Sequence, residues 1–161
     1  MSPRDLFDAA RRALADAPRE ALGQLREPRR VLGIARASRI VSAGRAWHLG
    51  VLLLTDDAVL ATGDIVRARR DAPRGFTAES QRARAELAAA ASRGGFADGE
   101  TVHVGWRMLD LDAIAGGEAS DPLAWRDGVL SVRWSVSAGY VPLEGYLRER
   151  IALLLDPPSG A

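Results

Sequence analysis

The chain has 161 residues, of which 47% are hydrophobic and 27% are charged, and its formal net charge is +1. This balance is that of one ordinary globular domain, and so small a charge does not by itself indicate nucleic acid or a membrane surface. All 22 basic residues are arginine, and neither lysine nor cysteine occurs. A lysine Schiff base, a disulfide and a cysteine-ligated metal are therefore excluded.

The first 28 residues predict a helical segment. Ser2 and Pro3 are typical of a helix start, and the apolar residues that follow share one helical face: Leu6, Ala10, Leu14 and Ala17. A short second helix is predicted over 19–26. The segment lacks the apolar run of a signal peptide, and no run in the chain approaches the length of a membrane span. We therefore expect a cytoplasmic protein.

Residues 29–156 predict one α+β domain, followed by a disordered tail over 157–161. The pattern from Arg30 onward is that of strands joined by very short connections, at Ser42 to Arg45, at Asp56-Asp57 and at Gly63. Such spacing predicts an antiparallel meander. Its expected strands cover 31–41, 46–55, 58–62 and 64–70.

A strong helix is predicted over 78–93, with Gly94 as its left-handed terminator. Residues 101–109 alternate as in a half-buried strand, with Val102, Val104, Trp106 and Met108 inward and His103 on the polar face.

Residues 123–136 predict a hairpin that turns at Asp127-Gly128. In that register Trp125 lies opposite Leu130 and Leu123 opposite Val132, with Trp134 and Val136 continuing the apolar face. An amphipathic C-terminal helix then begins at Pro142.

The stretch GVLLLTDDAVLATG, Gly50 to Gly63, resembles the strand-turn-strand of bacterial pleckstrin-homology and GRAM-type domains. The resemblance covers about residues 30–155. It implies two packed antiparallel sheets of about seven strands, closed by a C-terminal helix. The helix over 78–93 would be an insertion, and the N-terminal helix an addition. Those families commonly place a basic residue just after the turn, where this chain has Ala58.

Five residues near the first strand connection are candidate binding residues. In lipid-binding pleckstrin-homology domains, basic residues at this connection hold inositol phosphates, and here Arg36, Arg39 and Arg45 surround it. The alternative is that they are scattered surface arginines. Trp47 is either an exposed anchor for a partner or the edge of the core. His48 is either a general base or ligand, or a partly buried histidine bonded to the backbone.

These features predict a non-enzymatic binding module that takes a protein partner through a sheet edge or a helix groove. Anionic lipid headgroups are a weaker expected ligand. Homo-oligomerisation through the N-terminal helix is a third expectation. Nucleic acid is not expected, because no aromatic residues are interleaved with the arginine cluster at Arg67, Arg69, Arg70 and Arg74.

The rival hypothesis is a small hydrolase or metal-dependent enzyme that uses His48 with Asp56 or Asp57. Adjacent aspartates are also common in tight turns, where their side chains bond the local backbone. Asp110 and Asp112 begin like a calcium loop, but Ile114 occupies the next alternate position. No catalytic motif is present, and neither a metal nor a cofactor is expected.

Overall fold

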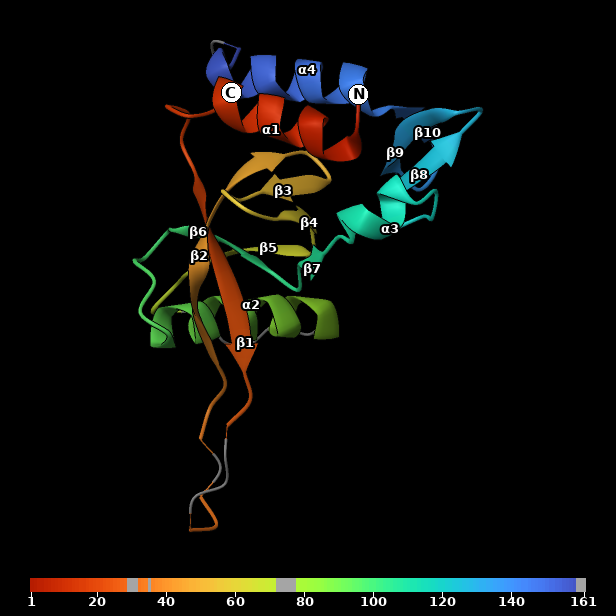
Figure 1. Cartoon of the computed structure of the whole chain (residues 1–161). Helices are drawn as coiled ribbons and strands as arrows, with labels where there is room; N and C mark the ends of the chain where they lie inside the picture. The colour runs from red at the N-terminus through yellow and green to blue at the C-terminus, as the bar shows by residue number, and fades with distance from the viewer. Residues whose placement is uncertain (29–31, 35, 72–77, 159–161) are drawn as a thin grey trace. The chain divides into compact units, whose positions relative to one another are not determined.

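The computed structural model describes residues 1–28, 32–34, 36–71 and 78–158, and within them it shows an α+β protein with four helices and ten strands (Figure 1). The α+β class and the C-terminal helix predicted from the sequence are confirmed. The chain divides into two compact units. The terminal unit comprises Met1–Arg19, Ala46–Thr62 and Arg107–Ala161, and the central unit comprises Glu20–Arg45 and Gly63–Trp106. No described helix is both long and apolar enough to cross a membrane.

The terminal unit contains three helices and two sets of strands. Its helices are α1 (Pro3–Ala13), α3 (Leu111–Ala115) and α4 (Leu143–Leu155). The end of β2 (Arg39–Leu49) pairs with β3 (Leu52–Leu54), which continues antiparallel through β4 (Val59–Ala61) to β7 (Arg107–Met108). A three-stranded antiparallel sheet follows in the order β10-β9-β8, made of β8 (Leu123–Arg126), β9 (Val129–Ser135) and β10 (Gly139–Pro142).

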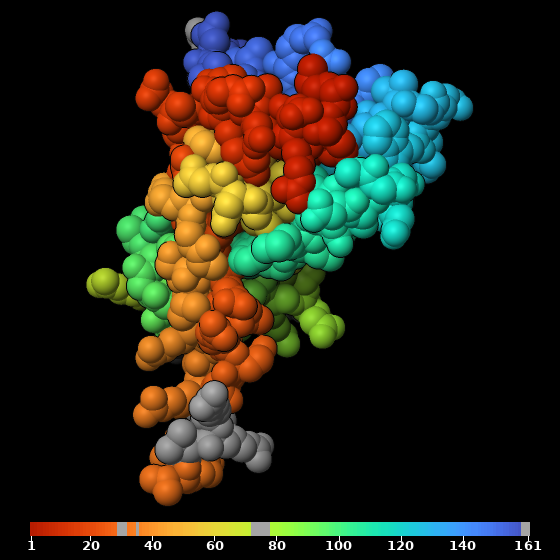
Figure 2. Space-filling model, in the orientation of Figure 1, coloured from red at the N-terminus to blue at the C-terminus, as the bar shows by residue number. Residues whose placement is uncertain are grey.

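The predicted N-terminal helix is confirmed as α1. Ser2 and Asp5 form a capping box, in which each side chain accepts a hydrogen bond from the other residue's backbone N–H. Phe7, Ala10 and Leu14 are buried in the core of the terminal unit, and α1 lies beside α4 in Figures 1 and 2. The apolar face of α1 is thus used within this unit. Dimerisation through this helix stays a prediction, and a dimer contact would have to use the polar face of α1.

The hairpin of β8 and β9 has the predicted turn and register. Asp127 and Gly128 both have positive φ, 50° and 76°, as a two-residue hairpin turn requires. Trp125 pairs with Leu130 and Leu123 with Val132. The prediction for the end of this face is wrong, since Trp134 is 44% exposed and Val136 is 94% exposed. On this face only the start of β9, at Leu130 and Val132, is buried.

The meander differs from the prediction at its first connection. Strand β2 continues through Ser42 to Arg45, where a turn was predicted. The chain reverses instead at Gly50, whose φ is 67°, before β3 begins. The turn at Asp56-Asp57 is confirmed. The predicted pairing across Gly63 is wrong, since residues 59–61 pair with β3 and β7, whereas residues 64–67 pair with residues 101–104.

The central unit contains one helix and a mixed set of strands. Its strand order is β5-β6-β1-β2, with β1 (Glu20–Arg26), β5 (Asp64–Arg67) and β6 (Thr101–Val104). Strand β5 is antiparallel to β6, whereas β1 is parallel to it. The predicted helix over 19–26 is therefore wrong. Gly23 shows the reason, because a Cβ there would lie 2.4 Å from Ile40 and 2.7 Å from Val102, so tertiary packing decides this segment over helix propensity.

The helix α2 (Glu79–Arg93) covers this unit with small side chains. The predicted helix is confirmed, and Ala90 and Ala91 are its buried residues. Its terminator is not Gly94, whose φ is −78°, but Gly95, with φ 104°.

The predicted strand over 101–109 is broken at Gly105, where φ is 68°. His103, placed on the polar face by the alternation, is fully buried, and Met108 beyond the break is 64% exposed. Two short elements were missed, α3 in the predicted loop after the break and β10 before the last helix.

Candidate functional site

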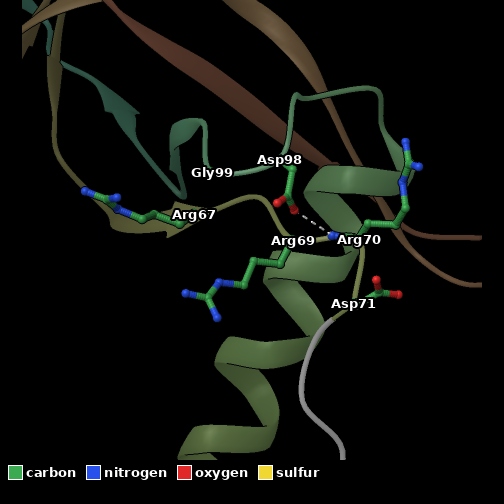
Figure 3. A pocket seen from close by; sticks show the side chains of 6 residues that line it. All are labelled: Arg67, Arg69, Arg70, Asp71, Asp98 and Gly99. Atoms are coloured by element: carbon green, nitrogen blue, oxygen red, sulfur yellow. Dashed lines mark hydrogen bonds between the residues drawn. The ribbon is translucent and has the colours of Figure 1, made fainter.

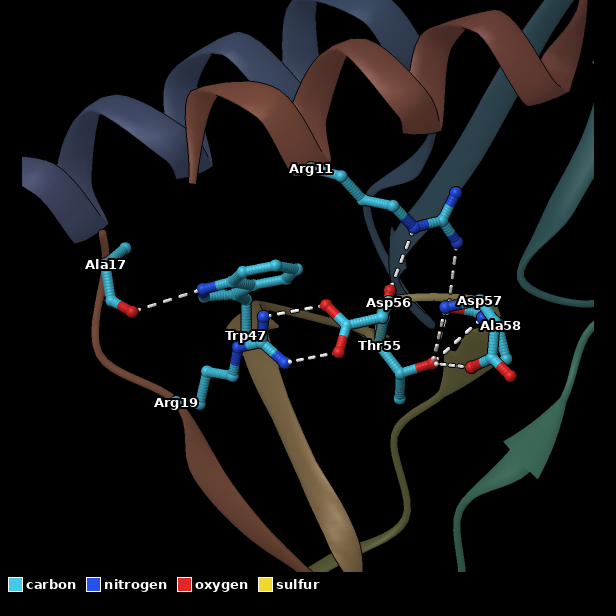
Figure 4. Close-up of polar contacts among 8 residues, drawn as sticks. All are labelled: Arg11, Ala17, Arg19, Trp47, Thr55, Asp56, Asp57 and Ala58. Atoms are coloured by element: carbon cyan, nitrogen blue, oxygen red, sulfur yellow. Dashed lines mark hydrogen bonds and ion pairs between the residues drawn. The ribbon is translucent and has the colours of Figure 1, made fainter. Parts of the chain in front are cut away.

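Trp47 is the edge of a core and not an exposed anchor. It is 2% exposed, and its indole Nε1 donates to the carbonyl of Ala17 at 3.2 Å. The Arg19 guanidinium lies 3.8 Å from the centroid of the Trp47 ring and donates two hydrogen bonds to the Asp56 carboxylate, at 2.7 and 3.0 Å (Figure 4). This hydrogen-bonded pairing with Arg19 lowers the pKa of Asp56 below its ordinary value of 3.8.

Asp57 belongs to the same turn. Its carboxylate accepts from the Thr55 hydroxyl at 2.9 Å, and that hydroxyl accepts from the backbone N–H of Ala58 at 2.8 Å. Arg11 on α1 donates to the carbonyls of Thr55 and Ala58 (Figure 4). Both aspartates therefore belong to the β3–β4 turn, but their carboxylates accept from the side chains of Arg19 and Thr55 and not from the local backbone, as the sequence alternative had it.

The side chain of His48 is half-buried, and its Nε2 lies 2.9 Å from the carbonyl oxygen of Gly50. The hydrogen bonds of Asp56 and Asp57 go to Arg19 and Thr55, not to this imidazole. The hydrolase hypothesis thus keeps no supporting contact between its three residues.

The carboxylates of the calcium-loop candidate also have structural partners. Asp110 caps α3 by accepting from the backbone N–H groups of Asp112 and Ala113. Asp112 pairs with Arg4 at 2.6 Å.

The three arginines proposed for lipid headgroups are placed on or near β2. Arg45 lies 3.8 Å from the Glu100 carboxylate, while Arg36 and Arg39 are exposed. None of the three lines the pocket at the end of β5, whose arginines are Arg67, Arg69 and Arg70.

The central unit also holds a buried histidine–carboxylate pair that sequence reasoning missed. The ring Nε2 of His103 on β6 contacts the carboxylate of Glu20 on β1. A carboxylate in bonding contact gives a buried imidazole a polar partner. No local pattern could have identified the pair, because it depends on the parallel pairing of two strands distant in sequence.

A pocket of about 550 Å³ opens beside the end of β5. Six residues line it (Figure 3): Arg67, Arg69, Arg70, Asp71, Asp98 and Gly99. Asp98 is already engaged, since its carboxylate accepts from the backbone N–H of Arg70 at 3.0 Å. The arginine cluster was noted in the sequence; Arg74, its fourth member there, lies outside the described residues.

Strand alternation explains which arginines act together. Val66 and Ala68 are buried in the core under α2, so residues 65, 67 and 69 project from the opposite face. Figure 3 shows the Arg67 and Arg69 side chains extending in one direction and that of Arg70 in another. Within the described part of the chain, these three guanidinium groups make no hydrogen bond or ion pair. The site therefore offers the guanidinium groups of Arg67 and Arg69, which come from the same face of the strand.

Among the described residues, no strand pairs with the outer side of the β5 backbone. Both backbone groups of Ala68 face the β6 side. Its N–H donates a hydrogen bond to the carbonyl of Glu100, and its carbonyl accepts one from the N–H of Gly99. In an antiparallel pair this direction alternates, so the N–H and C=O of Ile65 and Arg67 point away from β6. The N–H of Arg69 follows the same rule and donates to Ala88 of α2. The strand order places no described strand beyond β5.

No family model, no curated protein and no solved structure matches this chain.

Proposed function

We propose that this chain is a non-enzymatic, cytoplasmic binding module that takes an extended, acidic segment of a partner protein along the outer edge of β5. The single observation that carries the proposal is the unpaired edge at Ile65 and Arg67. An added strand would satisfy those backbone groups, as in other complexes formed by strand addition. The resemblance to pleckstrin-homology and GRAM-type domains stays part of this proposal as a prediction.

Arg67 and Arg69 make this strand edge favour an acidic partner segment. Arg67 and Arg69 are two residues apart on one strand, so the matching partner carries carboxylates at alternate positions. Charge-assisted hydrogen bonds between guanidinium and carboxylate groups are stronger than neutral ones, and they can be bidentate. Asp71 and Asp98 lie in the same pocket, which leaves an excess of one positive charge at the site.

The first test uses a short peptide with glutamate and valine at alternating positions, and a matched peptide with glutamine in place of glutamate. Isothermal titration is expected to show binding of the glutamate peptide, weakened by salt because the contacts are exposed ion pairs. The double substitution R67Q/R69Q should lower its affinity by about tenfold or more. Arg84→Gln is the matched control, since Arg84 is an exposed arginine of α2 that does not line this pocket.

A second variant tests the backbone edge directly. Ile65→Pro removes an N–H that points outward, which proline tolerates on an edge strand, so the fold should survive while binding is lost. Val66→Pro removes a donor to β6 and should destabilise the protein instead. If Ile65→Pro binds the glutamate peptide as the parent does, strand addition at this edge is wrong. Preferential binding to anionic lipid vesicles or to nucleic acid, lost on R67Q/R69Q, would also overturn it.

A further inference from the structure

A second cavity lies in the terminal unit, between the end of the β9–β10 hairpin and α4. Its volume is about 370 Å³, within the range of small-molecule sites. The walls are mostly apolar, with charged groups on one helix only. The lining residues are Trp134, Val141, Pro142, Gly145, Tyr146, Glu149 and Arg150.

Trp134 supplies the largest apolar surface of this groove. It lies on the same face of β9 as the buried Leu130 and Val132, but it is 44% exposed. A half-exposed indole that continues a core face presents a flat surface on which a ring or branched chain can pack. Val141 on the neighbouring strand is half-buried and extends this surface.

Arg150 supplies the charge, and it lies over the ring of Tyr146. Its guanidinium carbon lies 5.2 Å from the centroid of the Tyr146 ring. The Tyr146 hydroxyl donates to the carbonyl of Leu49 at 3.0 Å and accepts from the N–H of Val51 at 2.9 Å, so two hydrogen bonds hold the hydroxyl end of the ring beneath Arg150. Within the described residues, the guanidinium makes no hydrogen bond or ion pair, and its Nε is buried without a partner.

Gly145 lines the groove from the first turn of α4. A Cβ built at this position would meet no atom within 4 Å, so packing does not require the glycine. Because Gly145 lines the groove, we expect a large side chain there to occupy part of it.

We propose that this groove binds a small monocarboxylic acid with an aromatic or branched apolar body. The body packs against Trp134 and Val141, and the carboxylate pairs with the Arg150 guanidinium, whose planar fork suits a carboxylate. Glu149 at the same groove supplies a like charge that disfavours a second carboxylate on the ligand. This site is independent of the β5 edge, and neither proposal depends on the other.

The probe is naphthylacetate, compared with the neutral naphthylacetamide and the cationic naphthylethylamine. Binding is followed through the indole N–H resonances of the four tryptophans, with Trp134→Phe assigning that of Trp134. We expect naphthylacetate to shift the Trp134 resonance and to leave that of the buried Trp47 unchanged. The amide should bind about tenfold or more weakly, and the amine more weakly still.

Two variants with matched controls test the roles of the lining residues. Arg150→Gln should reduce naphthylacetate affinity about tenfold or more and leave that of the amide unchanged. Arg148→Gln, which removes the partner of Glu144 on the same helix, should change neither. Gly145→Leu should abolish binding of both compounds while the protein stays folded. Tightest binding of the amine, equal binding of acid and amide, or unaltered binding to Gly145→Leu would each overturn the proposal.

Discussion

Arg19, Trp47 and Asp56 illustrate how single side chains acquire their roles in this protein. The sequence correctly predicts that the aspartates at 56 and 57 belong to a turn. It does not show that Arg19, distant in sequence, bridges that turn to the indole of Trp47. Turn chemistry is local and can be read from residue types, whereas the ion pair and the stacking depend on how the chain folds back. For the same reason, the sequence could not decide whether Trp47 is a core residue or a surface anchor.

This cluster predicts a specific pH dependence. The pKa of Asp56 is lowered by its hydrogen bonds to Arg19, so the unfolded state binds a proton more readily than the folded state at this residue. The stabilising contribution is therefore fully present above pH 3.8, the ordinary value, and is lost as the pH falls through the folded pKa. We expect Asp56→Asn to lower the free energy of unfolding near neutral pH, with the difference from the parent shrinking on acidification.

Urea unfolding at several pH values measures this difference. Asp16→Asn is the control, because Asp16 is an exposed aspartate of the same unit that has no ion pair among the described residues. The effect should be small, since the Asp56 side chain is 74% exposed and solvent screens such pairs. A difference that stays constant through the acid range would show that Arg19 does not hold the Asp56 charge in solution.

At the scale of elements, the end of α2 depends on a close approach to β2. A Cβ at Gly94 would lie 1.6 Å from the carbonyl oxygen of Ile40, and a backbone atom cannot move aside as a side chain can. Gly94 has ordinary right-handed φ, so its need for glycine is purely steric. Gly95 is the reverse case, with φ 104° and no atom near the Cβ position.

Two alanine substitutions separate these causes. Gly94→Ala should destabilise the central unit by about 1–3 kcal/mol or more, as overpacking does. Gly95→Ala should cost only about 1–2 kcal/mol, from the left-handed backbone conformation. Thermal unfolding of both variants, compared with the parent, gives the order. A smaller loss for Gly94→Ala than for Gly95→Ala would mean that α2 does not pack against β2 in this way.

The elements that the sequence predicts well are those whose signals are local. The hairpin of β8 and β9 has both its turn residues and its alternating faces within one short stretch, and its register is as expected. Strand β1 has no such signal, because its pairing partner β6 follows it by about eighty residues and runs parallel to it. The proposed binding edge at β5 is predicted only in part. Its arginines are visible in the sequence, but the unpaired edge that gives them meaning follows only from the strand order.

At the scale of the whole molecule, the two units have cores of different chemistry. Among the described residues, the terminal unit buries 17 hydrophobic residues in one cluster, including Phe7, Trp47, Tyr146 and many leucines. The corresponding cluster of the central unit has eight such residues, of which four are alanine. Hydrophobic stabilisation follows the apolar area removed from water, so the central unit has much less of it. The large share of alanine in the helix over 79–93 already indicates this difference in the sequence.

Unequal cores should produce unequal local stability, because regions with few buried apolar contacts open at lower free energy. In native-state hydrogen exchange with increasing denaturant, the amides of α2, β5 and β6 should exchange through smaller opening free energies than those of α4 and β9. The β5 amides of Ile65 and Arg67 provide an internal check, since their outward N–H groups should exchange fastest within that strand. If α2 and α4 instead share one opening free energy, the two units unfold as a single cooperative body, and the smaller core is compensated by interactions other than apolar burial.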